Sequence, residues 1–170
     1  MNNEKQVDSY RFISGITKRM LKTWVGKETP RPIPYTPLTK PLSESTVALF
    51  SSAGIALKTD TPFDQEGERQ NPWWGDPSCR MIPLDAQTED VALYHLHIDP
   101  RYAREDLNCL FPLKQLQQLQ HTGEIGRAAP RHYSMMGYIL QPEELLRQTV
   151  PAIIRNLRAD HVDAVVLIPA

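Results

Sequence analysis

Several features that would narrow the function are scarce in this sequence. It contains only two cysteines, Cys79 and Cys109, which form no CxxC pair. We therefore expect reduced, structural thiols rather than a disulfide framework or a cysteine metal motif. No apolar run approaches the ~18 residues of a membrane span, and residues 1–12 are polar, unlike a signal peptide. These absences predict a soluble cytoplasmic protein with no membrane partner.

An excess of charge of either sign is also missing. Lys and Arg number 19 and Asp and Glu 20, which gives a net charge of −1, and no basic block stands out. Nucleic acid is therefore not an expected partner. The length of 170 residues is enough for one domain with a core of its own. The 15 prolines exceed the usual ~5%, so many connections should be irregular but ordered.

The sequence divides into an N-terminal part, residues 1–41, and a domain of residues 42–170. In residues 9–25, apolar side chains recur at helical spacing, and Gly26 can end the helix that this pattern predicts. The prolines that follow, up to Pro41, indicate an extended strap that holds this helix on the domain.

Strands and helices alternate in the domain. Buried strands are predicted at residues 46–50, 91–98 and 163–168, and helices at 113–119 and 143–159. This alternation predicts an α/β fold of three layers with a mostly parallel sheet. The last strand is a continuous apolar run, which is typical of a strand buried on both faces. We expect it inside the sheet with a neighbour on each side.

The connections between these elements carry further expectations. Residues 51–54 (SSAG) stand where a first strand-to-helix turn would lie, and such a turn can hold an anion. Residues 58–83 form a long polar loop, and residues 131–139 are ambiguous, with a short strand around Tyr133. Pro151 lies within the last predicted helix and should kink or divide it.

The sharpest local pattern is His95-Leu-His97-Ile-Asp99, at the end of the second predicted strand. Alternate side chains of a strand share a face, so the two histidines and the carboxylate should project together. Such a set could bind a transition metal and serve a hydrolase or lyase. The alternative is a polar pocket without a metal, which we favour because no further metal-ligand cluster is present.

Other polar residues can be interpreted in two ways. Asp106 and Asn108 could bind a polar substrate group, or could make the turn and cap interactions that these residue types favour. Arg80 could clamp a carboxylate with two hydrogen bonds, or could pair with Asp76 on the same loop. No Ser/His/Asp or Cys/His nucleophile arrangement can be recognised. The residues alone therefore indicate an α/β domain with a polar pocket, and no particular reaction.

Six segments between about Pro41 and Ala170 form a recognisable series. They are Gly75-Asp-Pro-Ser-Cys-Arg80-Met-Ile-Pro83, His95-Leu-His-Ile-Asp99, Asp106-Leu-Asn-Cys-Leu-Phe-Pro112, Gly123-Glu-Ile-Gly126, His132-Tyr-Ser-Met-Met-Gly137 and Val162-Asp-Ala-Val-Val-Leu-Ile-Pro169. Their order and spacing resemble the selenoprotein B family of glycine, sarcosine, betaine and D-proline reductases, in particular its short single-domain members.

The resemblance implies a redox nucleophile. In the family, the strand that matches residues 163–168 leads into a selenocysteine or cysteine. In the amino-acid reductases this group acts on an amine that a pyruvoyl group on a partner subunit makes reactive. Here the sequence ends at Ala170, where that residue is expected. Neither Cys79 nor Cys109 occupies the motif, so no catalytic residue is assigned in this chain, and the chain alone is expected to be inactive.

The function implied is reduction of a small amine or related polar molecule, through a selenol or thiol expected just after Ala170 and without another bound cofactor. The expected partner is a thiol or selenol electron-donor protein, and the chain would act in a homo-oligomer or a reductase complex. The alternatives are a metal-dependent hydrolase or lyase and a non-catalytic binding or assembly subunit. The substrate-binding residues predicted are His95, His97, Asp99, Asp106, Asn108, Arg80 and Ser134.

Overall fold

A computed structural model describes residues 14–26, 32, 34–71, 74–96 and 98–170. The chain forms two units, divided after Pro37. The described part of the first unit contains helix α1, Gly15–Val25, whose N-cap Ser14 accepts a hydrogen bond from the backbone N–H of Thr17. The predicted helix is thus confirmed from Gly15 onward, and its expected first turns lie outside the described residues.

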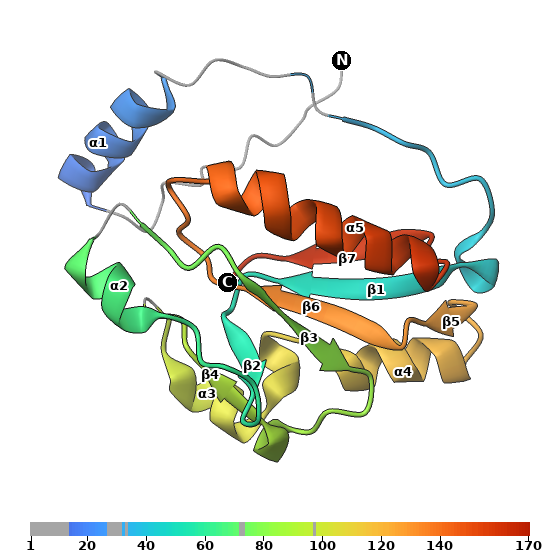
Figure 1. Cartoon of the computed structure of the whole chain (residues 1–170). Helices are drawn as coiled ribbons and strands as arrows, with labels where there is room; N and C mark the ends of the chain where they lie inside the picture. The colour runs from blue at the N-terminus through green and yellow to red at the C-terminus, as the bar shows by residue number, and fades with distance from the viewer. Residues whose placement is uncertain (1–13, 27–31, 33, 72–73, 97) are drawn as a thin grey trace. The chain divides into compact units, whose positions relative to one another are not determined.

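The second unit is built around strand β1, Thr46–Ser51. Three strands pair with it in parallel: β5, Arg127–Ala128, β6, Arg131–Met135, and β7, Ala164–Ile168. Strand β3, Cys79–Pro83, joins the sheet antiparallel to β6. The order is β3-β6-β1-β5, with β7 on β1 (Figure 1). The predicted α/β fold with a mostly parallel sheet is therefore confirmed, as is the short strand around Tyr133.

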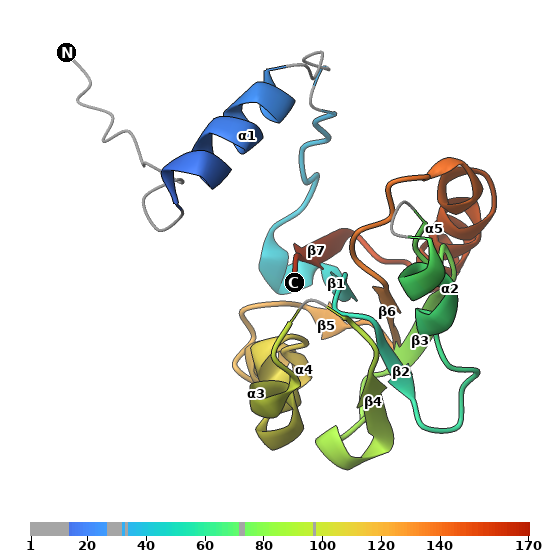
Figure 2. The ribbon, with the colours of Figure 1, turned by 90° about the vertical axis from the view of Figure 1, so that its left-hand side faces the viewer.

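Helices cover both faces of the sheet. Figure 2 shows α4, Leu113–His121, and α5, Val150–Ala159, on opposite sides of it. The remaining helices are short: α2, Gln65–Gln70, α3, Pro100–Glu105, and the 3₁₀ turns η1, Leu42–Glu44, η2, Thr88–Asp90, and η3, Leu107–Cys109. Because consecutive side chains of β1 alternate between the two faces, Val47 and Leu49 enter the main core, which also holds Phe111 and Leu116.

The domain also contains a second sheet of two strands, which was not predicted from the sequence. Strand β2, Ile55–Leu57, pairs antiparallel with β4, Val91–Leu93. The predicted strand 91–98 is therefore wrong beyond Leu93, because β2 offers only three partner positions. The predicted loop 58–83 is also corrected, since it contains both α2 and β3.

Strand β7 does not have the two neighbours that its apolar sequence predicts. Among the described strands it pairs with β1 alone, so it is an edge strand. Its side chains are correspondingly half-buried or exposed rather than buried. The sequence pattern misled because a run of apolar residues reports the apolar character of the surroundings, and does not report how many strands flank it.

The last helix is divided at Pro151, as predicted. A π-helical segment η4, Leu145–Thr149, precedes α5, and the backbone N–H of Val150 bonds to the carbonyl of Leu145. Proline lacks an N–H and disturbs the preceding turn, and a π-turn is one of the ways in which a helix accommodates this. Pro151 therefore stands in the first turn of a new α-helix.

Candidate functional site

The carboxyl ends of three parallel strands meet at one edge of the sheet. Ser51, the last residue of β1, is in register with Ile168 of β7 on one side and with Ser134 of β6 on the other. Figure 1 shows the C-terminal residue at this edge. In open α/β sheets, ligands bind beyond the carboxyl ends of the strands. We therefore call residues 51–54, 135–137 and 168–170, together with His95, the strand-end site.

Backbone hydrogen bonds hold the strand-end site together. The N–H of Ser52 donates to the carbonyl of Ile168 (3.1 Å), and the N–H of Gly54 donates to that of Met135 (2.8 Å). The N–H of Ala170 donates to Oγ of Ser52 (3.0 Å). The segment after β1 therefore connects the ends of β6 and β7, and Ser52 fixes the position at which the chain leaves β7.

The predicted strand-to-helix turn at residues 51–54 is corrected, because strand β2 and not a helix follows it. Gly54 has a φ of +62°, and a Cβ there would lie 2.6 Å from Sδ of Met136 and 3.1 Å from the backbone nitrogen of His95. Only glycine satisfies both the left-handed backbone and this close approach. Gly54 therefore makes the sharp turn that brings the segment containing His95 to the strand-end site.

Among the predicted site residues that the structure describes, His95 lies within the strand-end site. A Cβ at Gly137 would lie 2.8 Å from Nε2 of His95 and 3.2 Å from the carbonyl oxygen of Ser52. The imidazole thus lies against the backbone of Gly137, next to the residue that holds Ala170. Neither Ser52 nor Gly137 was predicted as a site residue, although Ser52 lies in the SSAG turn and Gly137 ends the segment His132-Tyr-Ser-Met-Met-Gly137.

Asp99 does not share a strand face with His95. It is the N-cap of α3, and its carboxylate accepts hydrogen bonds from Arg101, at 3.0 Å from the backbone N–H and 2.6 Å from the guanidinium. These bonds lower the pKa of Asp99. His97 lies outside the described residues. Across the described ranges, no three His, Cys, Asp or Glu side chains gather as a metal centre would require.

Asp106 and Asn108 take the capping role that the sequence left open. Asp106 is the N-cap of η3 and accepts from both the backbone and side-chain N–H groups of Asn108 (3.0 and 2.7 Å). Oδ1 of Asn108 in turn accepts from the N–H of Lys114 in α4 (2.9 Å). The bonds from Asn108 hold the pKa of Asp106 below its usual value. Substrate binding by these two residues stays a prediction.

Arg80 binds the neighbouring loop. Its guanidinium donates to the carbonyls of Thr61 (2.8 Å) and Pro62 (3.1 Å) and to Oγ of Ser78 (2.8 Å). It also lies 4.2 Å from the centre of the Phe63 ring, a cation–π contact. Asp76, the predicted partner, also bonds to Ser78, so that Ser78 links the two charges.

Ser134 is fully buried. Its Oγ accepts a hydrogen bond from the backbone N–H of Ile55 (2.8 Å) and so ties β6 to β2. Substrate binding by Arg80 and Ser134 stays a prediction, and both side chains have structural partners.

The two cysteines lack the surroundings of a reactive thiol. Burial raises the pKa of Cys79, against a smaller opposite effect from Arg80. The pKa of Cys109 is raised by burial and by the charge of Asp106. A nucleophilic cysteine needs the opposite shift, since the thiolate is the reactive form. Neither thiol has therefore been activated by its surroundings.

The fold and the strand-end site define an α/β domain whose candidate reactive edge lies at the carboxyl ends of parallel strands. The chain belongs to the glycine/sarcosine/betaine reductase selenoprotein B family, whose model matches residues 12–170. This confirms the resemblance that the six segments indicate.

Curated relatives carry related names. D-proline reductase subunit gamma of Acetoanaerobium sticklandii is 36% identical over 139 residues, which are 82% of this chain and 54% of that protein. Glycine reductase complex component B subunit gamma is 29% identical in Carboxydothermus hydrogenoformans and 28% in Symbiobacterium thermophilum, over 79% of this chain and 30% of each relative. The chain thus spans from about a third to about half of the length of these relatives.

No solved structure was found that matches the chain. In the part of the chain that the structure describes, no helix is long and apolar enough to cross a membrane.

Proposed function

We propose that this chain is part of a reductase subunit that acts on a small amine through a selenol or thiol placed directly after β7. Family membership supports the reaction class, because its relatives are named as reductase subunits. The observation that supports the position is the hydrogen bond from the N–H of Ala170 to Oγ of Ser52, which holds Ala170 at the strand-end site. A nucleophile there would stand beside His95.

The strand-end site limits how such a nucleophile could be stabilised. The backbone N–H groups of Ser52, Ala53 and Gly54 already donate to Ile168, Ser51 and Met135. They are therefore not free to stabilise an anion, as a loop at a helix N-terminus would. We propose instead that the imidazole of His95, which lies against Gly137 at the strand-end site, contacts the substrate or the selenolate or thiolate.

The names of the relatives suggest which substrate the reductase would act on. The relative with 36% identity is named for D-proline and the relatives below 30% for glycine. We therefore propose a small amino acid of this kind as the substrate, bound with His95 as a contact. An electron-donor protein carrying a thiol or selenol would then reduce the oxidised group, and the relatives' names support assembly in a reductase complex.

The test is to extend the chain through the codons that follow position 170, with cysteine in place of any selenocysteine. In a Cys79→Ser, Cys109→Ser background, alkylation by iodoacetamide as a function of pH reports the pKa of the new thiol. We expect a pKa below the ordinary ~8.5 of a cysteine, and slower alkylation at neutral pH in His95→Gln than in His121→Gln, a histidine on the distant end of α4.

Two outcomes would contradict the proposal. One is an extended thiol that titrates as an ordinary cysteine and is indifferent to His95→Gln. The other is thiol-dependent turnover by the 170-residue form, which would transfer the chemistry to Cys79 or Cys109.

A further inference from the structure

A cavity of about 610 Å³ lies between the β2–β4 hairpin and α3, in a part of the domain that the proposed function does not use. Figure 2 shows α3 beside β4, and the lining comes from these two elements and from the segments around them. The volume is within the range of small-molecule sites, about 300–1,000 Å³. The lining residues all belong to positions 55–107, in the middle of the chain.

The base of the cavity is apolar. Ile55 of β2, Ala103 of α3 and Leu107 of η3 are 0%, 6% and 4% exposed and line it from below. Val91 and Leu93 of β4 add two half-buried side chains. Contact with such a base removes apolar surface of a ligand from water, which is favourable. A ligand with an aliphatic group would therefore bind here more tightly than one without.

Two hydrogen bonds fix the walls of the cavity. Oγ1 of Thr88 accepts from the backbone N–H of Leu107 (3.2 Å) and so joins η2 to η3. Nζ of Lys58 donates to the carbonyl oxygen of Glu89 (2.5 Å) and joins the end of β2 to η2. Thr88 keeps its hydroxyl proton, and the ammonium group of Lys58 keeps two further N–H groups. The walls are thus held in place by local bonds and still offer donors to a ligand.

Four charged side chains line the same cavity, two of each sign. They are Lys58, Arg104, Glu89 and Glu105, and the ion pairs among the described residues involve none of them. A guanidinium can bind a carboxylate through two hydrogen bonds, and a carboxylate can bind an ammonium group. A ligand with a single charge would be repelled by half of this set. A ligand that carries both charges would be attracted by all of it.

We propose that this cavity binds an α-amino acid with an aliphatic side chain, at a site separate from the strand-end site. Arg104 binds the carboxylate of the amino acid, Glu89 and Glu105 bind its ammonium group, and the apolar base takes its side chain. The proposal does not depend on the reductase activity, because no nucleophile takes part and every contact comes from residues 55–107.

NMR titration of the 170-residue chain with L-leucine tests the chemistry of the ligand. N-acetyl-L-leucine lacks the ammonium group and L-leucinamide lacks the carboxylate. Each should bind roughly tenfold more weakly than L-leucine, as the loss of a charged hydrogen bond implies. Glycine lacks the side chain and should also bind more weakly, because it leaves the apolar base uncovered. Absence of L-leucine binding at millimolar concentrations, or equal binding of the four compounds, would overturn the proposal.

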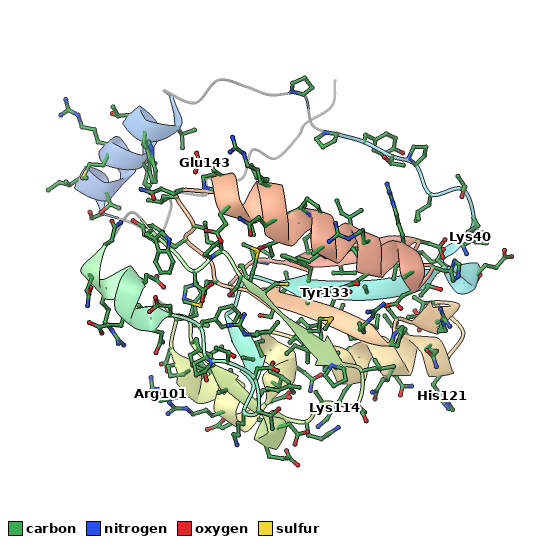
Figure 3. All side chains as sticks on the ribbon, viewed as in Figure 1. Lys40, Arg101, Lys114, His121, Tyr133 and Glu143 are labelled. Carbon is green, nitrogen blue, oxygen red and sulfur yellow. The ribbon has the colours of Figure 1, made fainter. Side chains whose placement is uncertain are left out.

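Matched variants test the position of the site. Arg104→Gln should weaken L-leucine binding by roughly tenfold, and Arg101→Gln should leave it unchanged. Arg101, labelled in Figure 3, is on the same helix, but it pairs with Asp99 and does not line the cavity. Circular dichroism checks that both variants fold. Equal effects of the two arginine variants would overturn the proposal, as would weaker binding in His95→Gln, which would assign L-leucine to the strand-end site.

Discussion

Serine and histidine occur together in two regions of this domain, with opposite consequences. In the interior, Nδ1 of His132 accepts a hydrogen bond from the backbone N–H of Leu49 (3.0 Å), while Ser134 accepts from that of Ile55. Both side chains are fully buried. At the strand-end site, Ser52 and His95 lie where three strands end and where the chain after β7 emerges. The first pair connects strands, and the second pair faces the place where chemistry is proposed.

The comparison teaches that residue type does not separate a structural histidine from a functional one. Burial lowers the pKa of His132 from 6.5 to about 4, and its Nε2 has no hydrogen-bond partner in the described part of the chain. Such a histidine remains neutral at physiological pH and serves as an acceptor. The predictions below test this difference, from the largest expected effect to the smallest.

The largest expected effect is a loss of folding stability at low pH. Because the folded-state pKa of His132 lies below its ordinary value, the unfolded state binds the proton more tightly. Stability should be complete above about pH 6.5 and fall as the pH drops toward about 4, by roughly 3 kcal/mol for this group alone. Denaturant unfolding at several pH values measures it. His132→Gln keeps an acceptor but cannot titrate, so an unchanged slope between these pH values in that variant would refute the assignment to His132.

Ser134→Ala should be the next most damaging change. It leaves the buried N–H of Ile55 without its acceptor, and an unsatisfied buried donor costs about 2 kcal/mol. Ser52→Ala is the counterpart at the strand-end site and should change the free energy of unfolding by less than about 0.5 kcal/mol. Chemical denaturation of the two variants compares them directly, and equal losses would remove the distinction between the regions.

Arg80→Ala tests whether Arg80 stabilises the neighbouring loop or binds the substrate. Loss of the bonds to Thr61 and Pro62 and of the contact with Phe63 should reduce stability by about 1 kcal/mol. Arg80→Lys keeps the charge but not the forked geometry, so it should be destabilised nearly as much. If instead both variants unfold as the parent does and weaken substrate binding in the assembled reductase, Arg80 belongs to the binding site.

Gly137→Ala, like Ser52→Ala, should have only a small effect on stability. The new methyl group would contact Nε2 of His95, the end of a flexible side chain that can move, so the free energy of unfolding should change by less than about 1 kcal/mol. The NMR signals of His95 should nevertheless shift, while those of His132 remain in place. A large loss of stability with an unmoved His95 would show that Gly137 serves packing alone.

The sequence predicted the parts of this fold that depend on local pattern. Apolar runs identified β1 and β7, and helical periodicity identified α4 and α5, with the division at Pro151. The two-stranded sheet of β2 and β4 was missed, because β4 is only three residues long and the apolar pattern continues beyond it to Ile98. The extent of β4 is set by its partner strand β2 and not by the residues of β4 themselves.

The candidate site was predictable only in part, for the same reason. His95 stood out because it lies in an HxHxD pattern, but that pattern does not show that Asp99 would turn away to cap α3. Ser52 and Gly137 each stand in a segment that the sequence marks, but no pattern in that segment distinguishes them from their neighbours. Their importance follows from the contacts of β1 with β6 and β7, which join residues far apart in the chain and leave no local signal.

The position of β1 as the common partner also has a consequence for synthesis on the ribosome. Its lateral partners β5, β6 and β7 all come much later in the chain, and the bond between Thr46 and Asp163 spans 117 positions. At about 5–20 residues per second, β7 emerges roughly 6–23 s after β1. Throughout that interval a strand of mostly buried apolar residues has no completed sheet to join. A holding chaperone should therefore raise the soluble yield, by protecting this early segment until β7 has been synthesised.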